Sequence, residues 1–441
     1  MATMDSGSEV AGGWVAVDGG FVVGIGSPGS EPPAKLSLDA RGCIVTPGFV
    51  NAHHHLFQNL TRSFAPATRS RLFGWATSLY PHWAHVDDEA VYLSAFVGLA
   101  ELALGGCTTT TDHLYLHPRG AGDLLAAEVK AARELGFRFH PTRGSMSVSE
   151  EEGGLPPKVL CEDEDTILAA CEQAVATYHD PTPGAMLRVA LAPCSVFSVS
   201  RRLMSETAEL AERLDVRLHT HLAEDTDEDA YSMETFGCRP IDLFEELGWM
   251  TGRSWVAHCV HPNAQEIRRL GAAKVGVAHC PSSNMILSSG LAPVAELRAA
   301  GSPVGLGCDG SASADSASLW MEARTAMLVA RYRSGDASFD ARQALEMATL
   351  GGAACLGRAG ELGVIRPGAV GDLVCWRLDG IAFAGALSDP VEALLRCGPV
   401  SAWHTVIAGK CLVEEGRLVH PDIPDRLERH RAASARVQGL A

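Results

Sequence analysis

Two pairs of histidines end short apolar runs of this sequence. In "TPGFVNAHHHLFQNLTR" the pair is His53 and His55. In "VRLHTHLAE" it is His219 and His221, and Glu224 follows three residues later. Side chains alternate along a β-strand, so the two histidines of a pair share one face. Three imidazole nitrogens and one carboxylate oxygen, with a position left for water, are what a catalytic zinc ion needs.

Further polar residues follow later apolar runs, namely His258 and His261, then His279, then Asp309. A single histidine at a strand end is more often a hydrogen-bonded loop residue than a ligand, but the joint pattern predicts a metal site. Such a metal lowers the pKa of a bound water toward ~7 and makes hydroxide available. By strand alternation, His54 points away from this site. Ordinary structural roles are expected for His85, His117, His179, His404, His420 and His430.

Eight apolar, β-branched runs alternate with segments whose apolar residues recur at helical spacing. This alternation predicts an α/β fold, a parallel sheet closed into a (β/α)8 barrel with the metal site at its carboxyl end. An open doubly wound sheet could also hold eight strands, but no Gly-rich GxGxxG segment follows a strand. The predicted strands are 43–55, 107–114, 137–144, 186–194, 216–224, 254–260, 275–281 and 304–310.

Gly-punctuated hairpins flank the predicted barrel. Residues 1–46 and 362–441 are expected to form a small β-sandwich domain from both chain ends, around a barrel domain at 47–361. The first hairpin lies close to Met1, which suggests that the chain begins part-way into that domain. The tail "PDIPDRLERHRAASARVQGLA" predicts a short charged helix.

Two long connections follow predicted strands at the carboxyl end of the barrel. They span residues 57–88 and 143–166. Long loops at this end of a barrel are usually lids or pocket walls, so we expect both to border the site.

Composition excludes several classes of partner. The 441 residues carry a formal net charge of −17, which disfavours binding to nucleic-acid backbones and anionic membranes. No long uncharged apolar run predicts a membrane-spanning helix, and the first residues lack the pattern of a secretion signal. The 13 cysteines are scattered without CxxC spacing, as in reduced proteins of the cytoplasm.

The whole chain resembles the amidohydrolase superfamily, in the aminohydrolase branch that contains guanine deaminase, S-adenosylhomocysteine deaminase and the s-triazine hydrolases. The motifs that carry this likeness are "PGFVNAHHH", "HTHLAE", "AHCV", "AHCPSSN" and "GCDGSAS". Other motifs resemble the 8-oxoguanine deaminases of that branch, namely "HHHLFQNLTR", "LFGW", "CTTTTDHLYLHP", "RGSMSVSEEEGGLPP" and "LAPCSVFSVS".

The resemblance implies a role for each residue of the predicted site. It makes Glu224 the proton shuttle and His258 the group that orients the attacking water, while Asp309 takes the proton of that water. The implied metal is zinc, with iron as the alternative, one ion in each subunit. Its implied ligands are His53, His55, His221 and Asp309.

Substrate contacts are implied for three more residues. Gln58 would meet an amide edge of the ring, Arg143 a ring carbonyl, and Trp75 would wall the ring. An amide and a guanidinium suit a heterocycle with amide edges and carbonyl oxygens. Asn284 and His113 are candidates for groups that support the site.

The implied reaction is deamination of 8-oxoguanine to urate and ammonia, by attack of metal-bound hydroxide on the ring carbon that bears the amino group. Isocytosine, guanine and pterins such as isoxanthopterin share the 2-amino-4-oxo edge and stay open as substrates. An s-triazine hydrolase is a further alternative, although the presence of both Glu224 and Asp309 favours deamination over dehalogenation. A non-enzymatic metal scaffold fits least, because structural zinc sites use four locally spaced ligands. Relatives often self-associate, so a homo-oligomer is expected.

Overall fold

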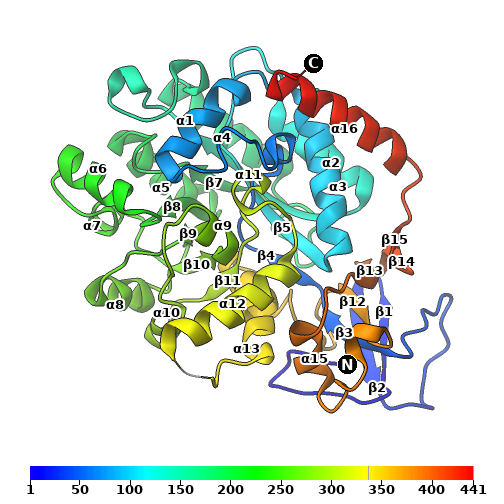
Figure 1. The fold of residues 1–441 in the computed structure, drawn as a ribbon. Coiled ribbons are helices and arrows are strands. Elements are labelled where there is room, and N and C mark those ends of the chain that lie inside the picture. The colour runs from blue at the N-terminus through cyan, green and yellow to red at the C-terminus, as the bar shows by residue number, and fades with distance from the viewer. Residues whose placement is uncertain (336, 441) are drawn as a thin grey trace.

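The computed structural model describes residues 1–335 and 337–440, and its centre is a closed barrel of parallel strands (Figure 1). Neighbouring barrel strands follow each other in the chain, and the last pairs with the first. This is the predicted (β/α)8 barrel. Its strands are β4 (Phe49–Asn51), β5 (Cys107–Leu114), β6 (Arg138–Ser145), β7 (Ala190–Pro193), β8 (Leu218–Leu222), β9 (Ser254–His258), β10 (Gly276–His279) and β11 (Val304–Leu306).

Helices surround the barrel, and their ends follow local sequence signals. Helix α3 (Leu124–Leu135) begins after Asp123, which accepts a hydrogen bond from the Ala126 N–H, and ends at Gly136 in the left-handed conformation. The other helices up to the end of the barrel are α1 (Leu72–Trp83), α2 (Asp88–Leu104), α4 (Glu164–Tyr178), α5 (Arg201–Leu214), α6 (Thr226–Phe236), α7 (Pro240–Glu246), α8 (Ala264–Ala273), α9 (Pro281–Ile286), α10 (Val294–Ala300), α11 (Ser311–Ala314), α12 (Leu319–Ser334), α13 (Ala341–Glu346) and α14 (Gly352–Cys355).

Short turns of helix lie between these elements. A π-helical segment, η4 (Met347–Gly351), joins α13 to α14, and the others are 3-10 turns. They are η1 (Leu56–Thr61), η2 (Glu150–Glu152), η3 (Lys158–Leu160) and η5 (Ile381–Phe383).

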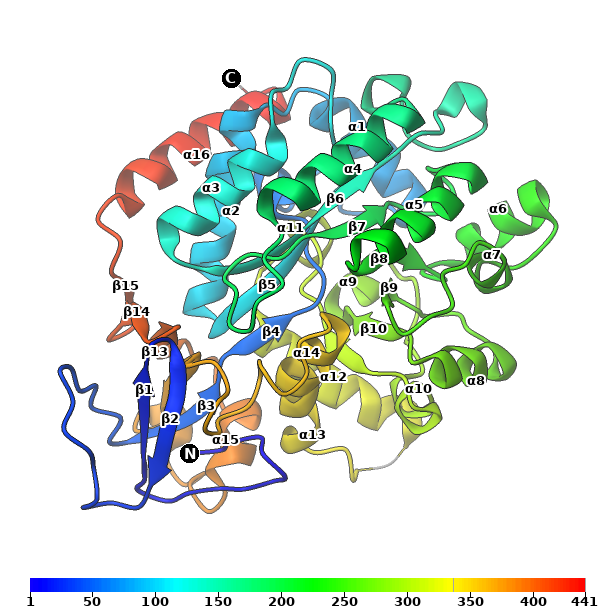
Figure 2. The same ribbon diagram turned by 180° about the vertical axis from the view of Figure 1, so that it is seen from behind.

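Segments from both chain ends form two antiparallel sheets beside the barrel (Figure 2). One is the hairpin of β1 (Trp14–Asp18) and β2 (Phe21–Gly26), and the other has the strand order β15-β14-β13-β12-β3. The predicted β-rich unit from the two termini is therefore present, while its boundaries after residues 46 and 361 stay a prediction. Its other elements are β3 (Cys43–Pro47), β12 (Leu373–Arg377), β13 (Ala402–Ile407), β14 (Lys410–Glu414), β15 (Arg417–Leu418) and α15 (Pro390–Arg396).

The single strand predicted for residues 43–55 is in fact two strands in different sheets. Strand β3 pairs with β12 of the terminal sheet, and β4 pairs with β5 and β11 of the barrel. Gly48 makes the change of sheet, and a Cβ there would lie 1.9 Å from Thr108 Oγ1. At residue 48 the chain passes too close to β5 to leave room for a side chain, so a glycine interrupts the apolar run there.

The C-terminal helix lies on the barrel rather than on the terminal sheets (Figure 1). Helix α16 (Ile423–Gln438) has 16 residues, so the tail is longer than the short helix predicted. Ser434 Oγ and Gln438 Nε2 each donate to the Leu60 carbonyl at 2.7 Å. The end of the chain therefore supports η1, the turn that follows His55.

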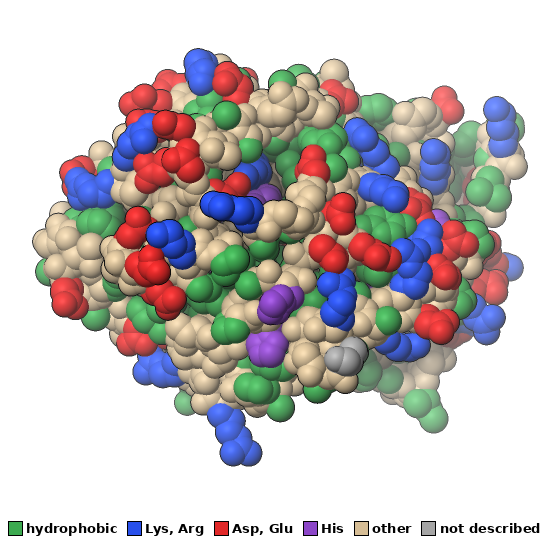
Figure 3. Space-filling model, turned by 90° about the horizontal axis from the view of Figure 1, so that it is seen from above, with side chains coloured by type: hydrophobic (Ala, Val, Ile, Leu, Met, Phe, Trp, Pro, Cys, Tyr) green, Lys and Arg blue, Asp and Glu red, His purple; other side chains and the backbone are tan. Residues whose placement is uncertain are grey.

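The described surface carries charges of both signs. Basic and acidic side chains alternate over the face seen from above in Figure 3. All 13 cysteines are free thiols. Among the described residues, none of the helices has the length and apolar character needed to span a membrane.

Candidate active site and metal centre

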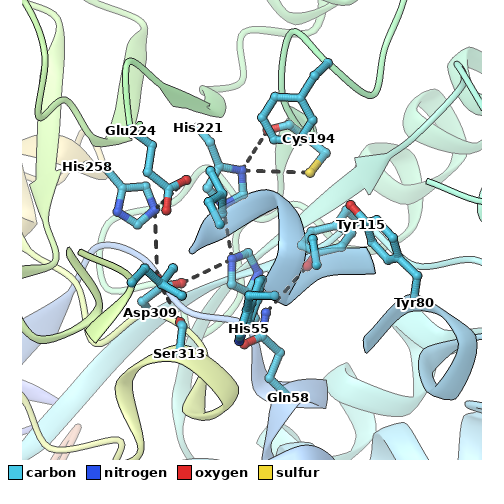
Figure 4. Close-up of a pocket in the computed structure, with 15 residues that line it drawn as sticks. His55, Gln58, Tyr80, Tyr115, Cys194, His221, Glu224, His258, Asp309 and Ser313 are labelled. Atoms are coloured by element: carbon cyan, nitrogen blue, oxygen red, sulfur yellow. Dashed lines mark hydrogen bonds and ion pairs between the residues drawn. The ribbon is translucent and has the colours of Figure 1, made fainter. Parts of the chain in front are cut away.

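The predicted catalytic and metal-binding residues meet at the carboxyl end of the barrel (Figure 4). His53 and His55 follow β4, His221 belongs to β8, and His258 ends β9. Asp309 follows β11, and its side chain, like the four imidazoles, is almost fully buried. Two overlapping groups of residues have ligand atoms that lie within 4.8 Å of one another inside each group. They are His53, His55 and His221, and His53, His258 and Asp309.

Left-handed backbone turns aim several of these side chains at the centre. The φ angles are 51° at Ala223, 70° at His258 and 57° at Asp309, although none is a glycine. Such conformations cost free energy and persist where the surrounding fold imposes them, as it does at functional sites. Each turn bends the chain directly after a barrel strand and brings a polar side chain over the barrel mouth.

Backbone carbonyls set the tautomers of His55 and His221. The Nδ1 atom of His55 lies 2.8 Å from the His113 carbonyl oxygen, and that of His221 lies 2.7 Å from the Cys194 carbonyl oxygen. Only an N–H can bond to a carbonyl oxygen, so both rings carry hydrogen on Nδ1 and a lone pair on Nε2. The two Nε2 atoms are 3.1 Å apart. Two lone pairs that face each other at this distance repel, and a cation bound to both would remove that repulsion.

His53 is oriented by another histidine. Its Nδ1 lies 2.8 Å from His219 Nε2, and His219 Nδ1 lies 2.9 Å from the Trp255 carbonyl oxygen. His219 must donate to that carbonyl, so its Nε2 accepts from His53 Nδ1. The Nε2 atom of His53 therefore also presents a lone pair, and it faces Asp309 Oδ1 at 3.3 Å.

These donors fit a divalent metal ion of the zinc type. Asp309 Oδ1 is also 3.3 Å from His55 Nε2, so three imidazole nitrogens and one carboxylate oxygen face one point. Burial lowers the pKa of His53 and of His221 well below the usual value. Burial opposes ionisation of Asp309, but its interactions with the imidazoles of His53, His258 and His55 hold its pKa well below the ordinary range. Metal ligands must be in these deprotonated forms.

Glu224 and His258 lie on the open side of this group (Figure 4). His258 Nε2 is 3.6 Å from Glu224 Oε2 and 3.9 Å from Asp309 Oδ2. His258 Nδ1 lies 2.9 Å from Asn284 Oδ1 and donates to it, so Asn284 orients His258. Burial, followed by the charges of Asp309 and Asp225, raises the pKa of Glu224 well above its usual value. The raised pKa favours the protonated form of Glu224, the form that can act as a proton donor.

Apolar and aromatic side chains wall a pocket in front of these groups. Trp75 lines it, with its Nε1 donating to the Ala312 carbonyl at 3.0 Å, which holds the indole in place. Gln58 also lines the pocket, and its buried Oε1 has no hydrogen-bond partner among the described residues. A flat ring with an N–H group suits such a pocket. The remaining apolar and aromatic lining comes from Leu72, Ala76, Tyr80, Tyr115, Phe197 and Leu287.

Arg143 does not reach this pocket. It lines a separate and larger cavity, where its Nη2 bonds both carboxylate oxygens of Glu162 at 2.8 and 3.0 Å. Strand register explains this. Thr142 pairs with the inward-facing His113, so the next residue, Arg143, points outward with Leu114. The structure therefore does not bring Arg143 together with the other predicted site residues.

His113 and His54 lie behind the pocket. His113 stacks on His221 with ring centroids 4.8 Å apart, and its Nε2 donates to the Ala192 carbonyl. Its own carbonyl is the acceptor that orients His55. His54 is fully buried and is not among the pocket residues.

Several pocket residues were missed by the sequence reasoning. Tyr115 lies two residues after His113, so strand alternation could have placed it on the same side. Tyr80 belongs to the long connection 57–88, whose helix gave no sign of which face meets the pocket. Cys194 and Ser313 also line it. Ser313 Oγ donates to Asp309 Oδ2 at 3.2 Å; both residues belong to the motif "GCDGSAS", but the motif alone did not indicate this contact.

Comparison with known proteins identifies the family. The sequence profile of the amidohydrolase family, whose members are typically metal-dependent, matches residues 44–409. The chain is 45% identical to 8-oxoguanine deaminase from Pseudomonas aeruginosa, over 98% of this chain and 96% of that protein. It is 38% identical to hydroxydechloroatrazine ethylaminohydrolase from Pseudomonas sp. strain ADP, over 90% and 82%.

A solved structure agrees in fold. The atrazine chlorohydrolase of Arthrobacter aurescens TC1, complexed with zinc, matches with a TM-score of 0.93 at 33% identity over 98% of both chains. The chain therefore belongs to the amidohydrolase family and is a hydrolase that acts on C–N bonds.

Proposed function

We propose that the chain is a zinc-dependent aminohydrolase that converts 8-oxoguanine to urate and ammonia. The observation that carries the proposal is the buried carboxyl of Glu224, 3.6 Å from His258 Nε2 and beside the group of His53, His55, His221 and Asp309. The similarity to a deaminase of 8-oxoguanine over nearly the whole chain supports the choice of substrate. Iron is the alternative metal.

The proposed mechanism assigns one task to each group. His53, His55, His221 and Asp309 would hold the zinc ion, which would supply a water of lowered pKa as the nucleophile. Asp309 and His258 orient that water toward the ring carbon that bears the amino group, and Asp309 accepts its proton. Glu224 donates its proton to the adjacent ring nitrogen, which lets the ring accept electrons. The amino group then takes up the proton held by Asp309 and leaves as ammonia, while the new hydroxyl returns a proton to Glu224 and becomes a carbonyl.

The pocket supports a planar amide-bearing ring as substrate. Gln58 Oε1 is a buried acceptor without a partner among the described residues, and a ring N–H would satisfy it. Trp75 and Tyr115 are large flat side chains that can cover the faces of such a ring.

Other rings with the same 2-amino-4-oxo edge remain alternatives, namely isocytosine, guanine and isoxanthopterin. An s-triazine hydrolase is a further alternative from a different reaction class. The carboxyl groups of Glu224 and Asp309 favour deamination, because an aromatic C–NH2 group needs protons delivered to both the ring and the leaving nitrogen.

A substrate panel tests the proposal. Ammonia release is measured for 8-oxoguanine, isocytosine, guanine and isoxanthopterin, and chloride release for a chlorotriazine, with the zinc content determined on the same sample. We expect the highest kcat/KM for 8-oxoguanine, loss of activity after chelation, and recovery with zinc. Turnover of the chlorotriazine alone would rule out the deaminase, and a higher kcat/KM for another amino heterocycle would replace 8-oxoguanine as the substrate.

A further inference from the structure

We propose that Glu228 is a positioning residue for the proton shuttle, because its buried carboxylate holds the turn that carries Glu224. This inference rests on the proposed function, in which Glu224 delivers the proton. Glu228 lies in the first turn of α6, and its side chain is fully buried. It is not among the residues that line the pocket, so its effect must pass through Glu224.

Each oxygen of the Glu228 carboxylate accepts one backbone N–H of the turn. The Ala223 N–H donates to Oε1 at 3.0 Å, and the Glu224 N–H donates to Oε2 at 2.7 Å. The two donors belong to consecutive residues and point the same way because Ala223 is left-handed, with φ 51°. Burial raises the pKa of Glu228 to about 7, and the two N–H groups oppose that rise because hydrogen bonds to an ionised carboxylate are stronger than those between neutral groups. Glu228 thus supports a backbone conformation that is costly for alanine.

The other side of the same turn is tied to the end of β9. The Ala223 carbonyl accepts hydrogen bonds from Val260 N–H at 2.8 Å and His261 N–H at 3.0 Å. The peptide groups around Ala223 are therefore fixed from both sides, by Glu228 and by the segment that follows His258. This double attachment sets the position of the Glu224 carboxyl, 3.6 Å from His258 Nε2.

Only a carboxylate of this length satisfies the geometry. Glutamine at 228 would offer one acceptor oxygen and would turn an NH2 group toward the other backbone N–H, leaving a buried donor without an acceptor. The turn would then relax, and the Glu224 carboxyl would move. A displacement of about 1 Å in a catalytic group can cost ~10²-fold in rate.

The first test is Glu228→Gln, with Asp227→Asn as the matched control. Asp227 lies in the same turn of α6 and is exposed, so its change is the same acid-to-amide substitution without contact with the buried turn. We expect Glu228→Gln to lower kcat by about 10- to 100-fold with KM within about 2-fold, and to retain its metal. Asp227→Asn should match the wild type. A wild-type kcat in Glu228→Gln would overturn the inference.

A double-mutant cycle separates positioning from a general structural role. In a Glu224→Gln background, Glu228→Gln should lower the residual kcat by no more than about 2-fold, because the group that it positions is already gone. A full repeat of the single-variant loss would show that Glu228 acts elsewhere and would overturn the inference. If Glu228→Gln does not fold, Glu228→Asp keeps the charge, retracts the carboxylate and carries the same expectation.

Amide hydrogen exchange tests the two hydrogen bonds between Glu228 and the turn without any substrate. Glu228→Gln should speed exchange of the Ala223 and Glu224 amides by at least about 10-fold relative to Asp227→Asn, since both amides lose or weaken their acceptor. Unchanged exchange would overturn the inference. This measurement needs no turnover, so it tests the role of Glu228 separately from the proposed function. The substrate panel tests the proposed function.

Discussion

At the scale of single residues, hydrogen bonds to backbone carbonyls set the tautomers of the histidines in the site. The carbonyls of His113 and Cys194 fix His55 and His221, and that of Trp255 fixes His53 through His219. Each ring is left with its Nε2 lone pair directed at the same point. Orienting partners of this kind raise the basicity of metal-binding imidazoles and hold them in place. The donor set is therefore prepared by hydrogen bonds before any ion is bound.

The residue-scale prediction concerns the proton shuttle. Glu224→Gln keeps the shape of the side chain but removes its acidic proton, so kcat should fall by roughly 10²–10⁴-fold, the usual contribution of a general acid. The zinc content should stay at the wild-type level, because Glu224 is outside the proposed ligand set.

The control is Glu162→Gln, which removes the carboxylate that Arg143 binds in the separate cavity. Its kcat should equal that of the wild type. An unchanged kcat in Glu224→Gln would remove this residue from the mechanism, and a loss in Glu162→Gln would show that the second cavity matters to turnover.

At the scale of elements, α1 forms one wall of the pocket. Leu72, Trp75 and Tyr80 of this helix line it and are buried. The residue before the helix, Arg71, donates through Nη2 to Asp225 at 3.0 and 3.2 Å, directly after Glu224. The start of α1 is thereby tied across the site to the β8 side of the barrel.

The element-scale prediction is that Arg71→Ala raises KM by about 2- to 5-fold, with a smaller change in kcat. An ion pair whose arginine is half exposed contributes up to about 1 kcal/mol. Its loss would let α1, the pocket wall that contacts the substrate ring, move. Steady-state kinetics on the best substrate of the panel measure it. Arg69→Ala, an exposed arginine two residues earlier, is the control and should match the wild type. Equal KM values for all three proteins would show that Arg71 does not hold α1.

At the scale of the whole molecule, buried neutral histidines couple folding to pH. Burial lowers the pKa of His279 to about 3 and that of His430 to about 4. Burial, followed by the charge of Arg358, lowers the pKa of His140 well below the usual value, and neither of its ring nitrogens has a partner among the described residues. Such groups bind a proton below about pH 6.5 only when the chain unfolds, so each lowers stability as the pH falls.

The whole-molecule prediction is that His140→Leu is less sensitive to acid. Between pH 7.5 and 5.5 each such histidine costs the wild type about 1.4 kcal/mol of unfolding free energy, and the variant should lose less by that amount. Denaturant unfolding at both pH values measures it. His85→Leu, at an exposed position, should show the wild-type difference. A His140→Leu protein with the full wild-type loss would mean that His140 is already protonated in the folded state.

Much of the barrel could be predicted because it rests on local pattern. The threonine-rich, β-branched run at 107–114 predicted β5 with its observed bounds, and the run at 304–310 begins where β11 begins, although β11 ends at Leu306. The split of residues 43–55 could not be seen, because both halves are apolar and only contact with Thr108 shows where Gly48 must turn. The docking of α16 on η1 also depends on a contact between distant segments.

For the site, the sequence by itself determined the residue types and their spacing, and hence the chemistry. The alternation of His53 and His55, and the placement of His221, Glu224, His258 and Asp309 after successive runs, are local properties that need no neighbour. Only the tertiary structure decided which atoms meet. It directs Arg143 outward to Glu162, sets Glu228 against the turn that carries Glu224, and chooses the carbonyls that fix each imidazole. These outcomes depend on how the closed barrel aligns strand ends from distant parts of the chain. The spacing of the strands along the sequence does not give that register.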